Sequence, residues 1–221
     1  MKKMKNAFLF DLNGTMIDDM YYHAKAWHDL LKEEVKTNLE WDEVASQMYG
    51  KNVEVLVRLF GPDRFAMAEM IRLSDKKEKR YQQLYKPLVK SINGLEPFLE
   101  ASKKNNISLA IGSAAIPENI DFVIDCLHIR HYFQSIVSAG DVVNSKPDPE
   151  TFLLNARQLG IEPSDCIVFE DAPKGVEAAQ RAGMQCVVIT TMHRPADFIG
   201  FDNIIRFILD YSTIKPFELF A

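Results

Sequence analysis

The segment Phe8-Leu9-Phe10-Asp11-Leu12-Asn13-Gly14-Thr15 decides the fold of this 221-residue chain, together with a second one, Cys166-Ile167-Val168-Phe169-Glu170-Asp171. In each segment an apolar run ends in a carboxylate. Strands of a parallel sheet that is buried on both faces read as near-continuous apolar runs, and the polar residues just beyond their carboxyl ends line the ligand-binding crevice. We therefore expect Asp11, Glu170 and Asp171 to lie together at one edge of a parallel sheet.

Three carboxylates at one edge of a sheet require a cation that offsets their repulsion. A set of oxygen ligands that leaves room for several waters suits Mg²⁺. The two segments thus predict a magnesium site formed by Asp11, Glu170 and Asp171, and with it metal-assisted phosphate chemistry.

The composition fits a globular protein that acts on small molecules. A chain of this length with 47% apolar residues can form a full core and one inserted domain. Its formal charge of −5 argues against a nucleic-acid partner, because binding a phosphate backbone needs clustered Lys and Arg. We expect a monomer with a small phosphorylated metabolite as its partner.

The cysteines and the chain start favour a cytoplasmic location. Cys126, Cys166 and Cys186 show no metal-ligand spacing, and we expect them to be buried, reduced thiols. Met1–Lys5 is basic, but the apolar run that follows is too short for a signal-peptide core, and no stretch has the length to span a bilayer.

Strand-like runs separated by helical stretches predict an α/β fold with a doubly wound parallel sheet. These runs are Ala7–Phe10, Ser108–Ile111, Ser135–Ala139, Cys166–Phe169 and Cys186–Ile189. Residues 16–88 break the alternation, since they look helical throughout. We expect a core domain of residues 1–15 and 89–221, and an all-helical cap domain of residues 16–88.

Within the predicted cap, Asp18 and Asp19 can cap a helix that starts near Met20. Further helices are predicted over 41–48, 53–59 and 65–85. Asn93-Gly94 marks the return to the sheet domain.

Asp11 is the candidate nucleophile. A carboxylate with a reference pKa near ~4 is ionised at neutral pH and needs no activating base to attack phosphorus. Gly14 allows a sharp turn after the strand, and Thr15 offers a hydroxyl and a backbone N–H to phosphate oxygens.

Two further segments supply groups that can bind a phosphoryl group. Ser113 follows a predicted strand and can donate to a phosphoryl oxygen near a helix N-terminus, although a plain N-cap is the alternative. Lys146 lies in the loop Asn144-Ser145-Lys146-Pro147-Asp148-Pro149, where the prolines restrict the backbone. Lys146 can neutralise charge on the nucleophile and the phosphoryl group, and a solvated loop lysine is the alternative.

With these four segments in order, the chain resembles the haloacid dehalogenase superfamily, and within it the β-phosphoglucomutase-like phosphatases and mutases with a helical cap. The motifs are FDLNGT, IGSA, SKPDP and FEDAPKGVEAAQRAG. The resemblance implies a Rossmann-like core and Asp11 as nucleophile. It also implies phosphate binding by Thr15, Ser113 and Ala114, bracing by Lys146, and Mg²⁺ binding by Glu170 and Asp171. A receiver-type signalling domain carries a similar set, but the helical insertion after the first strand argues against it.

The chain departs from this family at Asn13, where catalytic members usually have an aspartate. In the family this position binds Mg²⁺ through its main-chain carbonyl oxygen, and its side chain acts as the general acid/base. Asparagine keeps the carbonyl but cannot exchange a proton in that way. The change is compatible with an engineered trap, with a natural enzyme for activated substrates, or with a phosphate-binding pseudoenzyme.

The cap residues bear on the substrate. By resemblance to the mutase cap, His23 would steady position 13, whereas a hydrogen-bonded core histidine is the alternative. Lys77 matches a substrate-binding lysine, although a solvated helix face is the favoured explanation for it. The mutase arginine for the distal phosphate is replaced by Val53, and Lys51 or Arg58 is a possible substitute.

We expect Mg²⁺-dependent hydrolysis of a small phosphorylated metabolite, such as a sugar phosphate, through a phosphoryl-Asp11 intermediate. The alternatives are a sugar phosphate isomerase of the β-phosphoglucomutase type and a catalytically impaired phosphometabolite-binding protein.

Overall fold

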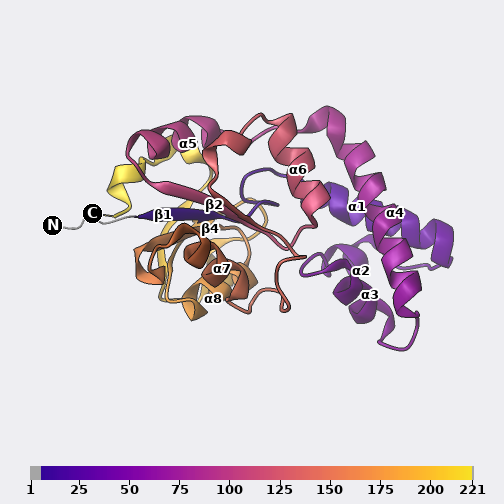
Figure 1. Cartoon of the computed structure of the whole chain (residues 1–221). Coiled ribbons are helices and arrows are strands. Elements are labelled where there is room, and N and C mark those ends of the chain that lie inside the picture. Colours follow the sequence, from indigo (N-terminus) through magenta and orange to yellow (C-terminus); the bar gives the residue numbers. More distant parts are fainter. Residues whose placement is uncertain (1–5, 221) are drawn as a thin grey trace. The chain divides into compact units, whose positions relative to one another are not determined.

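The computed structural model describes residues 6–220 and divides into two compact units (Figure 1). The first contains the chain up to Asp18 and from Lys90 onward, and the second is Asp19–Val89. Met16 belongs to the first unit, where its carbonyl oxygen accepts a hydrogen bond from the Ile92 N–H at 2.9 Å. The basic segment Met1–Lys5 lies outside the described residues.

The first unit contains a six-stranded sheet in the order β3-β2-β1-β4-β5-β6, in which every pairing is parallel. The predicted doubly wound α/β fold is thus confirmed. The strands are β1 (Ala7–Phe10), β2 (Ser108–Gly112), β3 (Ser135–Val137), β4 (Cys166–Glu170), β5 (Gln185–Ile189) and β6 (Ile204–Ile208). Both neighbours of β1 come from much later in the chain.

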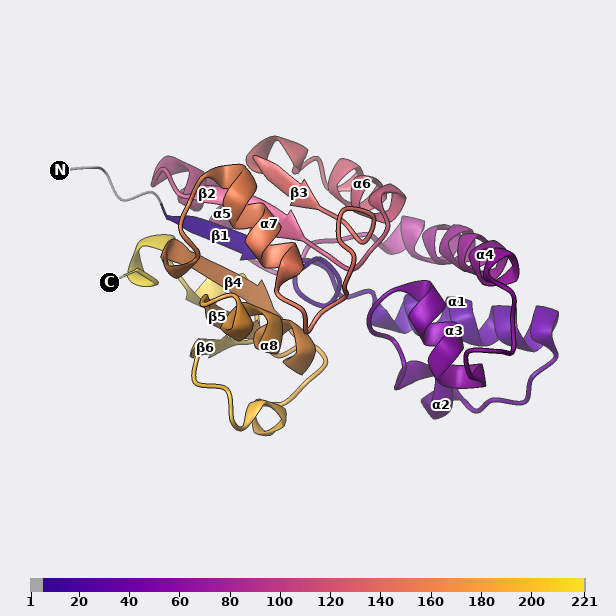
Figure 2. The ribbon, with the colours of Figure 1, turned by 60° about the horizontal axis from the view of Figure 1, so that its bottom comes forward.

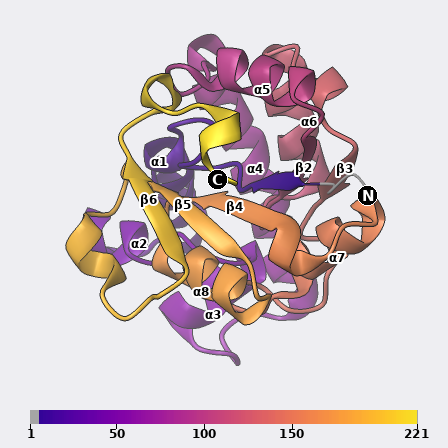
Figure 3. The same cartoon turned by 90° about the vertical axis from the view of Figure 1, so that its left-hand side faces the viewer.

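Helices cover both faces of this sheet. Figures 1 and 3 show α5 on one face and α7 and α8 on the other. The helices are α5 (Leu95–Lys104), α6 (Pro117–Cys126), α7 (Glu150–Leu159) and α8 (Pro173–Arg181), with the short 3-10 helices η3 (Arg130–Tyr132), η4 (Pro163–Asp165), η5 (Pro195–Phe198), η6 (Tyr211–Thr213) and η7 (Pro216–Glu218).

The two faces of the sheet carry different side chains, because successive residues of a strand point to opposite faces. Ala7 and Leu9 pack in a cluster of small and aliphatic residues with Phe152 of α7 and Val176 of α8. Phe8 points to the other face and stacks on Phe98 of α5 at 5.4 Å between ring centroids. Phe10 stacks on Phe169 of β4 at 4.7 Å. The sheet is therefore held between an aliphatic and an aromatic layer.

The second unit is helical, with α1 (Met20–Leu30), a π-helical turn η1 (Leu31–Val35), α2 (Trp41–Ala45), α3 (Asn52–Phe60), α4 (Met67–Tyr85) and the 3-10 helix η2 (Lys86–Leu88). Its core contains Trp27, Leu30, Val55, Leu56 and Leu73. The Asp19 side chain makes no capping hydrogen bond at the start of α1.

Two expectations are wrong at this level. The sequence pattern missed β6, where Arg206 interrupts the apolar run of a strand at the edge of the sheet. Cys126 is exposed at the end of α6, whereas Cys166 and Cys186 are buried, as expected. None of the helices among residues 6–220 has the length and apolar character that crossing a membrane requires.

Candidate active site

The carboxyl ends of the central strands bring the predicted residues of the first unit together. Asp11 follows β1, Ser113 follows β2, and Glu170 ends β4. Figure 2 shows the arrowheads of β1, β2 and β4 pointing the same way. Since polar residues beyond parallel strand ends share one crevice, this edge of the sheet is the candidate active site.

Lys146 reaches this edge from the loop between β3 and α7. Its ammonium group donates to Asp11 Oδ1 at 2.6 Å and to Glu170 Oε1 at 2.7 Å. It also donates to the Gly112 carbonyl at 3.1 Å and lies 4.6 Å from the centre of the Phe152 ring. Burial alone lowers the pKa of Lys146, but the charges of Asp11 and Glu170 outweigh it and raise that pKa. Lys146 is therefore a fixed buried cation rather than a solvated loop lysine.

Glu170 is fixed through both carboxylate oxygens. Oε1 accepts from Lys146, and Oε2 accepts from the backbone N–H groups of Asp171 at 2.9 Å and Ala172 at 3.0 Å. Hydrogen bonds from backbone N–H groups stabilise a carboxylate in its charged form. Glu170 thus holds Lys146 in addition to being a candidate metal ligand.

The three carboxylates fit a hard divalent cation. Asp11, Glu170 and Asp171 are buried, and each offers an oxygen within 4.8 Å of the others. Burial, together with the charges of Glu170 and Asp11, raises the pKa of Asp171 well above its usual value, although Lys146 opposes the shift. One lysine does not balance three carboxylates, and an oxygen-only set of this kind suits Mg²⁺.

The turn after β1 packs directly against Asp171. Gly14 has φ +80°, and a Cβ there would lie 2.1 Å from Asp171 Oδ2, so only glycine fits. The Thr15 hydroxyl faces Asp171 Oδ1 at 3.4 Å. Asn13 is half-buried and pairs with Ile17 in an isolated bridge, and the Gly14 N–H donates to the Ile17 carbonyl at 2.8 Å.

Ser113 and Ala114 begin the segment between β2 and α6. Ser113 is buried, its N–H donates to the Val137 carbonyl at 3.0 Å, and its Oγ accepts from the Ala115 N–H at 3.1 Å. Ile116 holds the N-cap position of α6, so Ser113 is not a plain N-cap. Its hydroxyl hydrogen can be offered to a ligand.

His23 and Lys77 lie together in the second unit. Lys77 Nζ is 2.6 Å from His23 Nδ1 and donates to Glu78 Oε1 at 2.9 Å, while Asn52 donates to the same oxygen at 2.6 Å. The expectation of a solvated Lys77 is wrong, because only 3% of the residue is exposed. Burial lowers the pKa of Lys77, against the opposing charges of Glu78 and Asp19.

The other two cap candidates occupy different settings. Lys51 is half-buried at the N-cap of α3, and its backbone N–H donates to Glu54 Oε2 at 3.0 Å. Arg58 donates to the Gln47 carbonyl at 2.8 Å and lies 3.7 Å above the Tyr49 ring. Arg58 is thus bound within the second unit.

The structure adds three residues that the sequence pattern did not single out. A Cβ on Gly175 of α8 would lie 1.8 Å from Glu170 Oε1. Thr191 and Tyr211 donate hydrogen bonds to carbonyl oxygens of the turn after β1. No local pattern identifies such residues, because their importance depends on which backbone or side chain they meet in the fold.

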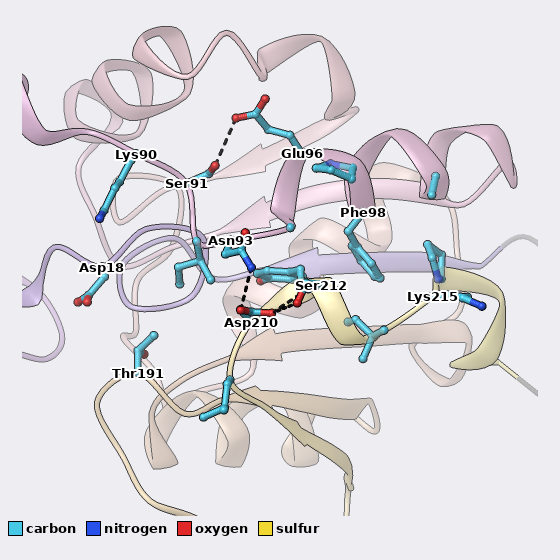
Figure 4. A pocket seen from close by; sticks show the side chains of 18 residues that line it. Asp18, Lys90, Ser91, Asn93, Glu96, Phe98, Thr191, Asp210, Ser212 and Lys215 are labelled. Atoms are coloured by element: carbon cyan, nitrogen blue, oxygen red, sulfur yellow. Dashed lines mark hydrogen bonds between the residues drawn. The ribbon is translucent and has the colours of Figure 1, made fainter.

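A hollow of about 1040 Å³ lies elsewhere in the first unit (Figure 4). Its lining includes Lys90, Asn93, Thr191 and Asp210 but not Asp11, Glu170 or Asp171. The acidic and basic groups of this lining do not converge as Lys146 does on Asp11 and Glu170. The strand-end cluster, formed by Asp11, Lys146, Glu170 and Asp171, is therefore the better candidate for the active site.

The fold and the strand-end cluster define the class of protein. The sequence profile described as haloacid dehalogenase-like hydrolase matches residues 8–189. The chain belongs to this family, and it is an enzyme of the phosphatase and phosphomutase type found there.

Several relatives and solved structures are similar to this chain along most of its length. An uncharacterized protein of Haemophilus influenzae is 37% identical over 83% of this chain and 90% of its own length. The fructose-1-phosphate phosphatase YqaB of Escherichia coli is 29% identical over 81% of this chain and 93% of its own. The structure is similar to that of β-phosphoglucomutase from Clostridium difficile, with a TM-score of 0.86 and 28% identity over 98% of this chain and 96% of the other.

Proposed function

We propose that this enzyme hydrolyses a small phosphorylated metabolite, such as a sugar phosphate, through a phosphoryl-Asp11 intermediate with the help of Mg²⁺. The observation that carries the proposal is the ion-paired set of Asp11, Lys146 and Glu170 beside Asp171 at the strand ends. The similarity to a fructose-1-phosphate phosphatase supports hydrolysis of a sugar phosphate.

In the first half-reaction an oxygen of Asp11 attacks phosphorus, and the bond from phosphorus to the leaving oxygen breaks. Lys146 partly neutralises Asp11 before the attack and the phosphoryl oxygens after it, because its ammonium lies 2.6 Å from Oδ1. Ser113 and Thr15 donate hydrogen bonds to the phosphoryl oxygens, with the backbone at Ala114 closing the set. In the second half-reaction a water oxygen attacks phosphorus and releases Asp11.

The metal would be held by the carboxylates of Asp11, Glu170 and Asp171 and by the main-chain carbonyl oxygen of Asn13. Bound there, Mg²⁺ supplies positive charge to the phosphoryl oxygens and orients them for in-line attack. Without it, the carboxylates repel an incoming phosphate dianion, and Lys146 alone opposes that repulsion.

Asn13 determines which leaving groups the enzyme handles well. An amide cannot protonate the leaving oxygen, so this chain would hydrolyse a sugar phosphate slowly, and an ester with a more acidic leaving group would lose less rate. His23 and Lys77 in the second unit, with Lys51, are proposed to contact the substrate or steady position 13.

A mutase and a phosphometabolite-binding protein remain the alternatives, the first because of the similarity to β-phosphoglucomutase. A mutase would interconvert sugar phosphate isomers without net release of phosphate. A binding protein would bind its ligand with no turnover even after Asn13→Asp.

The test compares the native chain with Asn13→Asp over a panel of sugar phosphates, other phosphomonoesters and an aryl phosphate. We expect Asn13→Asp to raise kcat on sugar phosphates about 10²- to 10⁴-fold and to change the aryl phosphate rate much less. Asp11→Asn serves as the control and should abolish turnover in both backgrounds. Phosphate release that survives Asp11→Asn, or no release from any variant, would overturn the proposal.

A further inference from the structure

Two hydroxyl groups hold the turn after β1 from behind. Thr191 Oγ1 donates to the Gly14 carbonyl at 2.6 Å, and the Tyr211 hydroxyl donates to the Thr15 carbonyl at 3.0 Å. Thr191 follows β5, and Tyr211 begins η6, so both come from the last part of the chain. Consecutive carbonyl groups of the turn are thus each fixed by a side chain.

The orientation of the Gly14–Thr15 peptide needs such a restraint. Gly14 has φ +80°, and glycine populates positive and negative φ about equally, so this peptide has little intrinsic preference. The peptide bond is planar and trans, and its C=O and N–H groups therefore point in opposite directions. A hydroxyl that fixes the Gly14 carbonyl therefore also fixes the direction of the Thr15 N–H, which donates to the Leu12 carbonyl at 3.4 Å within the turn.

Tyr211 is suited to donate rather than accept. Its ring is buried beside Phe98 and Phe169 at 5.5 and 5.7 Å between centroids. Burial, together with the charges of Asp11 and Asp171, raises the pKa of Tyr211 well above its usual value. Because a carbonyl oxygen can only accept, the Tyr211 hydroxyl is the donor to the Thr15 carbonyl, and it adds a directed hydrogen bond to the packing that the ring supplies.

A third contact fixes Tyr211 itself. Its N–H donates to the Asn93 carbonyl at 2.9 Å, and the Asn93 amide donates to Asp210 Oδ2 at 3.0 Å (Figure 4). A Cβ on Gly94, which has φ +79°, would lie 2.8 Å from the Tyr211 carbonyl carbon, so the two segments approach as closely as backbones can. The position of the Tyr211 hydroxyl is thus set by the segment around Asn93.

We propose that Thr191 and Tyr211 are positioning residues that hold the turn Asp11–Thr15 in the orientation that binds the phosphoryl group. They act through the Gly14 and Thr15 carbonyls and do not touch the substrate. The inference rests on the proposed function for its kinetic consequence only, since the orientation of the turn can be observed without turnover.

The chain offers matched controls for both hydroxyls. Thr190 is the neighbour of Thr191, and its hydroxyl also donates to a backbone carbonyl, that of Ile208 at 3.2 Å. Tyr132 donates to Glu100 at 3.2 Å, far along the chain from the turn. Thr190→Val and Tyr132→Phe therefore remove the same chemical groups and leave the contacts to the turn intact.

The experiment measures four quantities for Thr191→Val, Tyr211→Phe and the two controls: the melting temperature, the amide resonance of Thr15, and kcat and KM on the best phosphate ester. We expect the Thr15 amide to shift in Thr191→Val and Tyr211→Phe only. We expect kcat to fall about tenfold for each, the size of one hydrogen bond, with the controls within about twofold. Thr191→Ser should restore both the amide position and kcat.

An unmoved Thr15 amide in Thr191→Val and Tyr211→Phe would overturn the inference, whatever the kinetics show. So would equal losses of kcat in the variants and their controls, because these would indicate general destabilisation. If no ester is turned over by any form of the enzyme, the proposed function fails, while the amide shift and the binding of inorganic phosphate still decide the positioning role. Weaker phosphate binding in Thr191→Val than in Thr190→Val would support it, and equal binding would count against it.

Discussion

At Gly175, the carboxylate of Glu170 occupies the space that any side chain would need. A Cβ there would lie 1.8 Å from Oε1 and 1.9 Å from the carboxyl carbon of Glu170. Gly175 is in the first turns of α8, and its φ is not in the left-handed region. The requirement for glycine therefore comes from the close approach and not from the backbone conformation.

Gly175→Ala should destabilise the protein by about 1–3 kcal/mol, because the Glu170 side chain has to leave its place between Lys146 and the backbone. Helix propensity alone predicts the opposite, a gain of up to about 1 kcal/mol on replacing a helical glycine by alanine. Urea denaturation shows whether Gly175→Ala lowers or raises the free energy of unfolding. Phosphate release should also fall at least about tenfold.

Gly140→Ala is the control for this change, since its Cβ would meet only Ser138 Oγ, at an ordinary 3.6 Å. It should leave phosphate release within about twofold of the native rate. If Gly175→Ala proves more stable than the native chain and equally active, Glu170 has room to move, and its placement is less critical than the geometry indicates.

Sequence reasoning at this scale succeeds for residues that follow strands and fails for residues that act through the fold. Asp11, Ser113 and Glu170 could be predicted because a buried apolar run ends beside each of them. Thr191 and Gly175 could not, because hydroxyl residues and glycines are common and only the folded chain shows what they meet. Their roles in activity, like those of the predicted site residues, await the experiments above.

Among the elements, α4 contains a buried ion pair, Lys77 and Glu78, that its charged sequence does not predict. Lys77 and Glu78 lie among charged neighbours, which favours a solvated face, yet both are buried. The reason lies on other helices: Asn52 of α3 donates to Glu78, and His23 of α1 meets Lys77. A pattern read along one helix cannot include partners supplied by two others.

We expect Lys77→Met to destabilise the protein by about 3 kcal/mol or more, because it leaves the buried Glu78 carboxylate without its cation. The double change Lys77→Met/Glu78→Gln should cost clearly less, since residue 78 then carries no charge that has lost its ion-pair partner. Urea denaturation of both variants, with the exposed Lys79→Met as control, tests this. Equal losses in the single and double variants would mean that packing and not charge governs the site.

The edge strand β6 is the element that the sequence pattern missed. In its sequence Ile204-Ile205-Arg206-Phe207-Ile208 the three middle residues are all exposed, Ile205 and Phe207 by more than a third, and only Ile208 is buried. An edge strand has a neighbour on one side only, and its pattern is diluted by residues that meet water. The inner strands β1, β4 and β5 are almost wholly buried, and their patterns predicted them well.

For the whole molecule, we expect the carboxylate cluster to make stability depend on pH and, if the proposed metal site binds it, on Mg²⁺. The folded-state pKa of Asp171 is raised above its unfolded value near ~3.9 in the metal-free protein. The folded state then holds a proton that the unfolded state has lost, so this group's contribution to stability falls as pH rises above the unfolded pKa. Mg²⁺ bound as proposed would reverse this balance, because it would bind the carboxylates of the folded state only.

The prediction compares the native chain with Asp171→Asn by thermal denaturation between pH 4.5 and 7.5. In the metal-free protein, the stability of Asp171→Asn relative to the native chain should increase with pH. With Mg²⁺ at about 100 times its Kd, the native chain should gain about 2.7 kcal/mol at neutral pH and the variant little. A native chain that does not respond to Mg²⁺ would contradict the proposed metal site.

The order of the strands has a consequence for how the protein is made. β1 lies between β2 and β4, yet it leaves the ribosome before both of them, and its four apolar residues wait for about 100 residues before β2 follows. At roughly 5–20 residues per second this takes about 5–20 s. The second unit, complete by Val89, already has all its core side chains by then. The newborn chain therefore exposes the apolar strand β1 while the helical unit that follows it already has its core, which makes Ala7–Phe10 the stretch that a co-translational chaperone has most reason to shield.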